Sequence, residues 1–397
     1  MPGVLTRLTV VGVKVESTEG TYAAPTSTNV LTIVEAPKIE EVKESIDRNR
    51  VKASFGMGKP LRGMRGANVT IPTEFRGAGT SGAESIKPEN HDLLLNALGK
   101  WHKKNGTLSA NSGCTSTVIK FQQSHGLSVG DPILFTLSGI PRFVATVDSA
   151  TQVTLNSGLG ITPATGVAIK AGHGYRSAIA QSDYGSLTFS AWLDAETSGP
   201  QFRGLGGRVE KLAITDFEVG KIPKLEASLK CLDGTWVTAT TSPAGKSYRG
   251  QLPPVGLYGI IQKDGVAIAI EKLELTLENT VPEEKDLNAP SGKVRQYHTG
   301  RKITGKFDPR VEQGNIDLQN LLDQNTTFSI MAVLGIRNSS NVLQQGTVVG
   351  IYLPRVVLTK PGLDNKDGLM KHSYEFMAHE DETATGGGDN EIYIGIV

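Results

Sequence analysis

Several separate segments of this chain alternate apolar and polar side chains residue by residue, and this alternation constrains the fold more than any other feature. In residues 224–231 every second side chain is apolar and the ones between are charged or hydroxylated, and residues 271–278 repeat the pattern with three leucines. Residues 68–75 and 187–193 alternate in the same way. Because successive side chains of a strand point to opposite faces, such segments bury one face and expose the other, as in antiparallel sheets. The sequence therefore predicts a mainly β protein.

Two short helices interrupt this pattern, and they expose an internal repeat. The first is predicted at residues 88–98, with Pro88 and acidic residues at its start and Gly99 at its end. The second is predicted at residues 315–323. In each half an alternating strand precedes the helix, a strand containing Thr-Phe-Ser follows it, and two further strands come next. The repeat predicts two tandem β-sandwich domains, each with a short flanking α-helix.

The domain boundaries follow from this repeat and from changes in composition. A linker-like run rich in small and polar residues falls near residues 241–250. We predict a discontinuous first domain at residues 1–109 and 174–240, a second domain at residues 251–380, and a C-terminal arm at residues 381–397. The Gly-rich stretch of that arm precedes a short alternating strand, residues 391–397.

Residues 110–173 interrupt the first domain and are low in charge. Short strand signals separated by turn residues predict a small all-β barrel or sandwich inserted into a loop of that domain. The predicted strands are residues 117–121, 133–137, 143–147, 152–155 and 166–170. The alternative is that these are extra strands of the first domain itself.

Composition excludes several functional classes. The 397 residues hold 41 Lys and Arg against 40 Asp and Glu, a formal net charge of +1. This balance argues against a basic nucleic-acid coat and a polybasic membrane binder. No apolar run reaches the length of a membrane span, so we expect no membrane partner. The two cysteines, Cys114 and Cys231, lie far apart and predict neither a disulfide framework nor a zinc cluster.

A search for catalytic motifs gives no candidate. Residues 240–247 end in Gly-Lys-Ser like a phosphate-binding loop, but Pro243 removes a backbone N–H that phosphate would need, so a linker fits better. The seven histidines have no metal-binding spacing, and there is no Gly-x-Ser-x-Gly elbow. We expect no catalytic residue, no metal and no cofactor, and a protein that is not an enzyme. A hydrolase site assembled from distant residues stays open as an alternative.

With the repeat established, the chain resembles tail tube proteins, the major tail proteins of long-tailed, non-contractile bacteriophages (siphoviruses). The opening segment, residues 13–26, is similar to the start of such proteins, with a short strand, a Glu, a Gly-Thr pair and a Pro-Thr. Residues 76–79 and 93–99 are similar to the stretch that leads into their single helix, and residues 290–293 and 300–305 are similar in the second half. The resemblance covers most of the chain outside residues 110–173, which it places as a decoration on an outer wall.

The resemblance implies a structural virion protein. Three doubled chains would form a ring with pseudo-sixfold symmetry, and rings would stack into the conduit through which double-stranded DNA is ejected. Its partners would be other copies of the chain, the tape measure protein and the tail terminator, in a virion tail assembled in the cytoplasm of the bacterial host. If each domain gives about four strands, the inner barrel has about 24, a backbone diameter of about 48 Å and a bore of roughly 35–40 Å. Duplex DNA, about 20 Å wide, would pass through that bore.

The repeat and the ring together suggest functional residues of two kinds. Glu271, Glu274 and Glu278 are candidates for acidic side chains lining the lumen, because a net acidic lining would let DNA slide without gripping it. Their alternative is an ordinary solvated strand face.

The second kind of functional residue is expected in arms that bridge rings by adding a strand to a sheet of a neighbouring chain. Ile392, Tyr393, Ile394 and Ile396 are the candidates, with residues 1–26 and a long loop at 35–50 as further extended pieces.

A competing function is a phage or bacterial surface adhesin or carbohydrate-binding β-sandwich. It predicts clustered exposed aromatics, whereas Trp101, Trp192 and Trp236 are scattered in the sequence.

Overall fold

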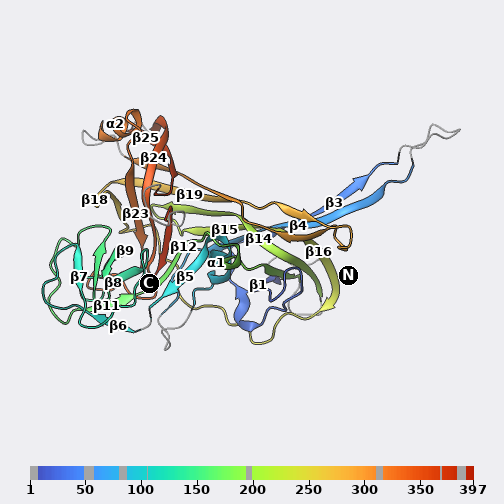
Figure 1. Ribbon diagram of the computed structural model, residues 1–397, viewed down its shortest axis with the longest axis horizontal. Helices are drawn as coiled ribbons and strands as arrows, with labels where there is room; N and C mark the ends of the chain where they lie inside the picture. Colours follow the sequence, from blue (N-terminus) through green and yellow to red (C-terminus); the bar gives the residue numbers. More distant parts are fainter. Residues whose placement is uncertain are drawn as a thin grey trace.

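The computed structural model describes residues 8–48, 58–79, 87–104, 106–193, 199–309, 316–366, 369–381 and 390–397. These residues form a mainly β protein, as predicted, with two short α-helices (Figure 1). Most strands belong to one hydrogen-bonded system that runs through both halves of the chain. It divides by its pairings into one long sheet and two short sheets.

The long sheet joins eight strands of the described chain in one antiparallel ladder. Its order is β3–β4–β15–β14–β19–β22–β25–β24. The strands are β3 (Lys38–Ile46), β4 (Leu61–Glu74), β15 (Lys224–Cys231), β14 (Gly199–Glu218), β19 (Ile270–Thr280), β22 (Gly300–Pro309), β25 (Leu369–Ala378) and β24 (Val349–Lys366). The first four come from the first half and the last four from the second, so the same order of strands occurs twice in succession.

The two halves also share their irregularities. The β14–β15 pairing shifts register between Val209 and Lys211, and the β24–β25 pairing shifts between Leu358 and Lys360. Further toward their N-termini, β14 and β24 carry a second matching shift, against β13 (Leu187–Trp192) and β23 (Phe328–Leu334) respectively. Because β-bulges sit at defined positions, two coinciding bulges make β24 the structural counterpart of β14.

These bulges correct one detail of the repeat. They place Leu187 opposite Gly207 and Phe328 opposite Val356, so Phe328 corresponds to Leu187 and not to Phe189. The Thr-Phe-Ser letters shared by the halves are therefore two residues out of structural register. The order of elements identifies the repeat correctly, whereas the three-letter match does not.

Each half also has a short sheet, because β14 and β24 are long enough to leave the long sheet at their N-terminal ends. The first short sheet has the order β2–β1–β13–β14–β16, and the second has the order β18–β17–β23–β24–β26–β12–β5. Their remaining strands are β1 (Val10–Val15), β2 (Val30–Leu31), β16 (Asp233–Thr240), β17 (Ile260–Lys263), β18 (Val266–Ala267), β26 (Tyr393–Ile396), β12 (His173–Ser177) and β5 (Gly99–Lys103). The apolar faces of the long and short sheets share one core cluster.

Both helices pack on this core through buried leucines. α1 (His91–Leu98) buries Leu93, Leu94, Ala97 and Leu98, and α2 (Ile316–Asp323) packs near β24 through the buried Leu318. α1 ends at Gly99, which has a φ of 91°. A Cβ there would lie 2.4 Å from the Cβ of Ala178, so only glycine lets the chain turn directly into β5. Both predicted helices are present. Two 3₁₀ turns lie at Ser27–Asn29 and Gln181–Asp183.

The low-charge segment forms a separate six-stranded sheet with its own apolar core. An isolated bridge between Ala110 and Phe121 joins its first and last strands, so the sheet closes into a small barrel, here called the insert barrel. β5 leads into it and β12 leads out, and these two strands pair with each other. In sheet order its strands are β6 (Thr107–Ser109), β11 (Ala168–Ala171), β8 (Pro132–Phe135), β9 (Ile140–Ser149), β10 (Gln152–Leu155) and β7 (Val118–Lys120).

The insert barrel leaves the first half but packs on the second. Phe143 of the barrel stacks on Tyr352 of β24 with ring centroids 5.6 Å apart, and Tyr352 stacks on Tyr393 of β26. Tyr352 and Tyr393 lie on the face of the second short sheet that is opposite the common core, and Phe143 packs onto that face. The layers are therefore long sheet, core, short sheet and insert barrel.

The two hairpins of the long sheet behave differently. Residues between β19 and β22 form a smaller hairpin, β20 (Glu283–Lys285) and β21 (Lys293–Gln296), that packs on the first half. The Arg65 amide donates to the Ser291 carbonyl over 3.2 Å, and the Gln296 amide donates to Glu19 over 2.8 Å. In the first half the β3–β4 hairpin, the counterpart of β19–β22, projects away from the body of the molecule (Figure 1).

One sequence prediction about these segments is wrong. Residues 35–50 were expected to be a long loop, but Lys38–Ile46 form β3, hydrogen-bonded along β4. The apolar residues Ile39, Val42 and Ile46 do not alternate, because most of β3 is exposed on both faces. The described part of residues 1–26 includes β1, which is buried in the first short sheet. The domain boundaries themselves stay predictions.

Candidate functional site

The candidate functional feature of this molecule is the seam where its halves join. This seam is a contact between two strands and not a cleft. β14 of the first half pairs with β19 of the second from Lys211↔Glu278 to Glu218↔Lys272. Leu212 and Ile214 on one strand and Leu275 and Leu277 on the other are buried in the common core. The ladder thus combines backbone hydrogen bonds with a continuous apolar face, which is what a stable sheet requires.

The C-terminal strand forms a second seam in the short sheets. β26 pairs with β24 on one side and with β12 of the first half on the other. The predicted arm residues lie in this region, and all four are buried: Ile392, Tyr393, Ile394 and Ile396. Both edges of β26 are occupied within its own chain, so an inter-ring role would require this strand to leave its sheet. That role stays a prediction, and most of the preceding arm lies outside the described residues.

The repeat explains why the C-terminal strand lies there. β16 pairs with the N-terminal part of β14, just as β26 pairs with the N-terminal part of β24. β26 is therefore the counterpart of β16. β16 is the last strand of its short sheet, whereas β26 pairs further with β12. Gly130 of the insert barrel lies against it, and a Cβ at Gly130 would sit 1.8 Å from the Tyr393 ring. The barrel and β26 are fitted to each other.

Two of the three predicted lumen residues lie on the polar face of the long sheet. Glu274 and Glu278 alternate with the buried leucines of β19 and are partly exposed. Glu271 lies within the register shift of β19, between Ile270 and Leu273, and its backbone amide donates to Asp308 over 3.1 Å. That this face lines a lumen stays a prediction.

The same face carries alternating charges across neighbouring strands. One row runs Glu274, Lys306, Glu375 and Lys360 across β19, β22, β25 and β24, and another runs Lys211, Glu278 and Lys302. Lys211 lies 3.9 Å from Glu278, and Lys360 lies 3.7 Å from Glu375. Together the two rows hold three acids and four bases, so opposite charges alternate across this part of the face. A net acidic lining stays a prediction.

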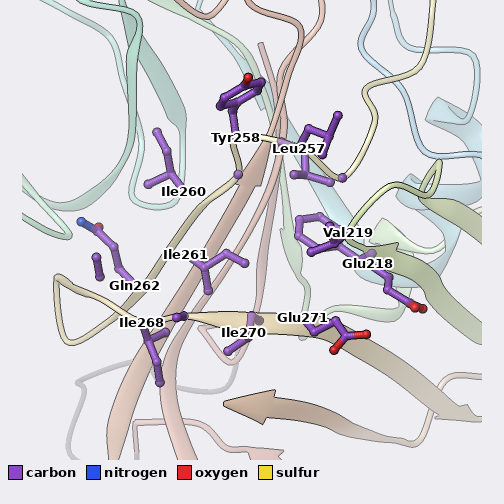
Figure 2. Close-up of a pocket in the computed structure, with 16 residues that line it drawn as sticks. Glu218, Val219, Leu257, Tyr258, Ile260, Ile261, Gln262, Ile268, Ile270 and Glu271 are labelled. Atoms are coloured by element: carbon purple, nitrogen blue, oxygen red, sulfur yellow. The ribbon is translucent and has the colours of Figure 1, made fainter. Parts of the chain in front are cut away.

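A cavity lies at the seam between the halves, next to the end of β14 (Figure 2). Its volume is about 440 Å³, and most of its lining is aliphatic. Glu218 and Glu271 are the acidic side chains of this lining, and Figure 2 shows them on the same side of the cavity, away from Ile260 and Gln262. The lining includes no His, Cys, Ser or Lys.

The environments of three buried titratable side chains, Cys231, His91 and His298, indicate that these residues contribute to the structure. Burial raises the pKa of the Cys231 thiol to about 12, so this cysteine is not a nucleophile at neutral pH. Burial also lowers the pKa of His91 to about 3 and that of His298 to about 4. His91 Nδ1 lies 2.8 Å from the Tyr175 hydroxyl, and His298 stacks on Tyr184. Within the described ranges, no group of three or more His, Cys, Asp or Glu could hold a metal ion.

Sequence reasoning missed the two edges of the long sheet. Among the described residues β3 pairs only with β4, and the part of β24 beyond Thr359 pairs only with β25. The available signal was the repeat itself. The strand before β22 in the second half, β19, has to have a counterpart before β4 in the first half, and β3 is that counterpart.

Comparison with known proteins adds the family. The family model described as phage tail tube protein matches residues 6–378, nearly the whole chain. A search of curated proteins finds no match. None of the helices in the described part of the chain has the length and apolar character needed to cross a membrane.

Proposed function

Because the chain belongs to the phage tail tube protein family, we propose that three copies of it close into a ring and that such rings stack into the tube of a virion tail. Family membership makes it a structural component of the tail that assembles with itself. The number of chains in the ring, the stacking and the passage of DNA are the proposal.

The observation that carries the proposal is the doubled long sheet. One chain supplies two successive sets of four strands in the same order, joined by the β14–β19 ladder. A repeat of this kind has two free edges, and joining such edges around a closed ring satisfies both. A six-domain ring of single-domain units corresponds to a three-chain ring of doubled units.

The strand number supports a channel of useful width. Three chains with eight strands each give an inner barrel of about 24 strands, with a backbone diameter of about 48 Å and a bore of roughly 35–40 Å. Double-stranded DNA, about 20 Å wide, fits through that bore with room for water and ions. This agrees with a conduit for genome ejection into the host.

The lining of the conduit would be the polar face of the long sheet, which includes Glu274 and Glu278 and on which acids and bases alternate. Lys and Arg that contact phosphates hold DNA by releasing counterions. Alternating bases with acids across the strands weakens that grip without making the wall repulsive. DNA would therefore slide past without specific binding.

The insert barrel would lie on the outside of the tube. It is separated from the long sheet by the common core and the second short sheet. The tape measure protein inside the tube, the tail terminator at its end, and assembly in the host cytoplasm complete the proposal by analogy with the family. No observation on this structure favours the adhesin alternative.

Electron microscopy of the purified protein at high concentration tests the proposal. Rings or tubes of uniform width with an open channel are expected, and native mass spectrometry of single rings should give three times the mass of one chain. A protein that stays monomeric at every concentration and salt condition would contradict it.

A further inference from the structure

The two unpaired edges of the long sheet are counterparts of the two strands that join the halves. β3 and β19 hold equivalent places because each pairs with the next strand in the same register: Ile39 lies opposite Val69, and Leu275 lies opposite Gly305. The strands β4 and β22 are equivalent through their pairing with β15 and β25. The shared bulges make β24 beyond Thr359 the equivalent of β14 beyond Glu210.

We infer that β3 of one chain pairs antiparallel with β24 of the next chain, in the register that β19 and β14 have within one chain. This inference rests on the proposed ring and specifies its chain-to-chain contact. The partner is a second copy of this chain, because the molecule itself contains the same contact in covalently linked form.

The intrachain ladder fixes the register residue by residue. Lys211↔Glu278, Leu212↔Leu277, Ala213↔Thr276 and Ile214↔Leu275 are the pairs within one chain. Transferred to the free edges, they give Lys360↔Val42, Pro361↔Glu41, Gly362↔Glu40 and Leu363↔Ile39 between chains. A slip by an odd number of residues would place one strand out of phase with the core face of its own sheet. The intrachain ladder selects this register among those that keep the phase.

The exposure of β3 agrees with a strand that pairs with another chain. Val42 and Ile46 are apolar and 42% and 50% exposed, on a strand of nine residues with an open edge. Proteins normally shorten, cover or distort such edges, since an open edge pairs with other chains. In the transferred register Glu40 lies diagonal to Lys360, so opposite charges meet across the contact.

Pro361 limits the ladder at one position. It has no N–H and so contributes only its carbonyl oxygen as an acceptor. A proline in a strand is tolerated at an edge, which is where Pro361 lies in the isolated chain. The chain-to-chain ladder is therefore expected to be weaker than the β14–β19 ladder.

Paired cysteines test the register. The chain with Val42→Cys and Lys360→Cys should form disulfides between chains on mild oxidation of assembled protein, because directly opposed residues lie within disulfide range. Non-reducing gels should show covalent dimers and trimers and no larger species in isolated rings. Both native cysteines are buried and should not interfere.

Two matched controls bracket this result. Lys211→Cys with Glu278→Cys places the pair in the intrachain ladder and should form an internal disulfide in monomers and rings alike. Lys360→Cys with Glu40→Cys moves one partner two residues along the strand, where the diagonal spacing of about 7–8 Å should lower the yield at least about tenfold.

The outcomes separate the inference from the proposed function. Rings of the double variant in which positions 42 and 360 of neighbouring chains form no disulfide would overturn the inference and leave the ring intact. Rings in which position 42 of one chain is linked to position 42 of another would do the same. A wild-type protein that forms no rings would remove both.

If the double variant itself fails to assemble, amide hydrogen exchange on the wild-type protein decides. The amides of residues 39–42 and 360–363 that point to the free edges should exchange at least about tenfold more slowly in rings than in monomers, apart from Pro361, which has no amide hydrogen. Unchanged exchange there would contradict the pairing.

Discussion

The outward faces of the two short sheets lie at equivalent places in the repeat but are covered in different ways. In the first half the loop between β1 and β2 lies over this face, with the Arg203 guanidinium stacked on the Tyr22 ring at 4.1 Å. Tyr352, the counterpart of Arg203 in β24, is covered instead by Phe143 of the insert barrel. The first cover is held largely by hydrogen bonds to Glu16, Thr188 and Ser190, and the second is an apolar cluster.

This difference shows which parts of the unit are fixed and which vary. The long sheet repeats its strand order, its registers and its bulges, whereas the covers share neither sequence nor fold. A surface that must join other domains in a closed ladder tolerates little change. The outward faces need only be shielded from water, and either a loop or a barrel does this.

The largest expected effect comes from removing the apolar cover. Phe143→Ala should lower the free energy of unfolding by about 3–5 kcal/mol, because the ring is buried and its loss leaves a cavity against Tyr352. Tyr22→Ala at the other cover should cost only about 1–2 kcal/mol, since that ring is half-buried. Chemical denaturation of both variants measures the difference.

Leu137→Ala, on an exposed part of the insert barrel, serves as the control and should change stability by less than about 0.5 kcal/mol. Equal costs for the two covers would contradict the contrast between them.

A second comparison concerns the two strands that the repeat makes equivalent. Leu275→Ala in β19 should destabilise the isolated chain by about 2–4 kcal/mol, because Leu275 is buried in the seam. Ile39→Ala in β3 should cost the isolated chain less than about 1 kcal/mol but raise the concentration needed for ring formation. Denaturation of monomers and light scattering of assembly separate the two effects. A large loss of monomer stability with Ile39→Ala would show that β3 does not depend on a partner.

The third prediction concerns acid sensitivity where the halves meet. The pKa of His298 is lowered to about 4 by burial, so below its unfolded value of about 6.5 the unfolded chain binds a proton that the folded chain does not. Stability should therefore fall as pH decreases from 6.5, by about 2 kcal/mol at pH 5 for this residue.

His298→Gln should remove that contribution, while His91 in the first half, with its pKa lowered to about 3, should continue to give its own. Denaturation midpoints at several pH values measure both. A slope that His298→Gln leaves unchanged would place the sensitivity elsewhere.

The smallest effect is expected on the polar face of the long sheet. Glu278→Gln should change stability by less than about 0.5 kcal/mol, because its contact with Lys211 is long and exposed. In assembled tubes the same change removes the one acid of the row Lys211, Glu278 and Lys302 and should increase the retention of duplex DNA at low salt. Retention equal to that of wild type would show that this row does not face DNA.

The sequence predicts the strands that have one wet face and one buried face. β15, β19 and the five strands foreseen in the insert barrel are recognisable because alternation or turn residues mark them. The helix at α1 is recognisable from its flanking Pro88 and Gly99. In each case the information is local.

What the sequence does not reveal depends on contacts between distant segments. β3 has little alternation because, among the described residues, its second edge has no partner strand and most of its surface is exposed. The C-terminal strand looks like a free arm, since nothing local indicates that β12 and β24 lie on either side of it. The packing of the insert barrel on the second half could not be predicted from the sequence either, because Phe143 and Tyr352 are far apart in the chain.

Cryo-electron microscopy of the assembled tube tests the central claim most directly. We predict a ring of three chains whose inner wall is a closed barrel of about 24 strands, with six similar lobes and three insert barrels outside. A ring with another number of chains, or two halves of one chain lying in unrelated positions on the wall, would contradict it.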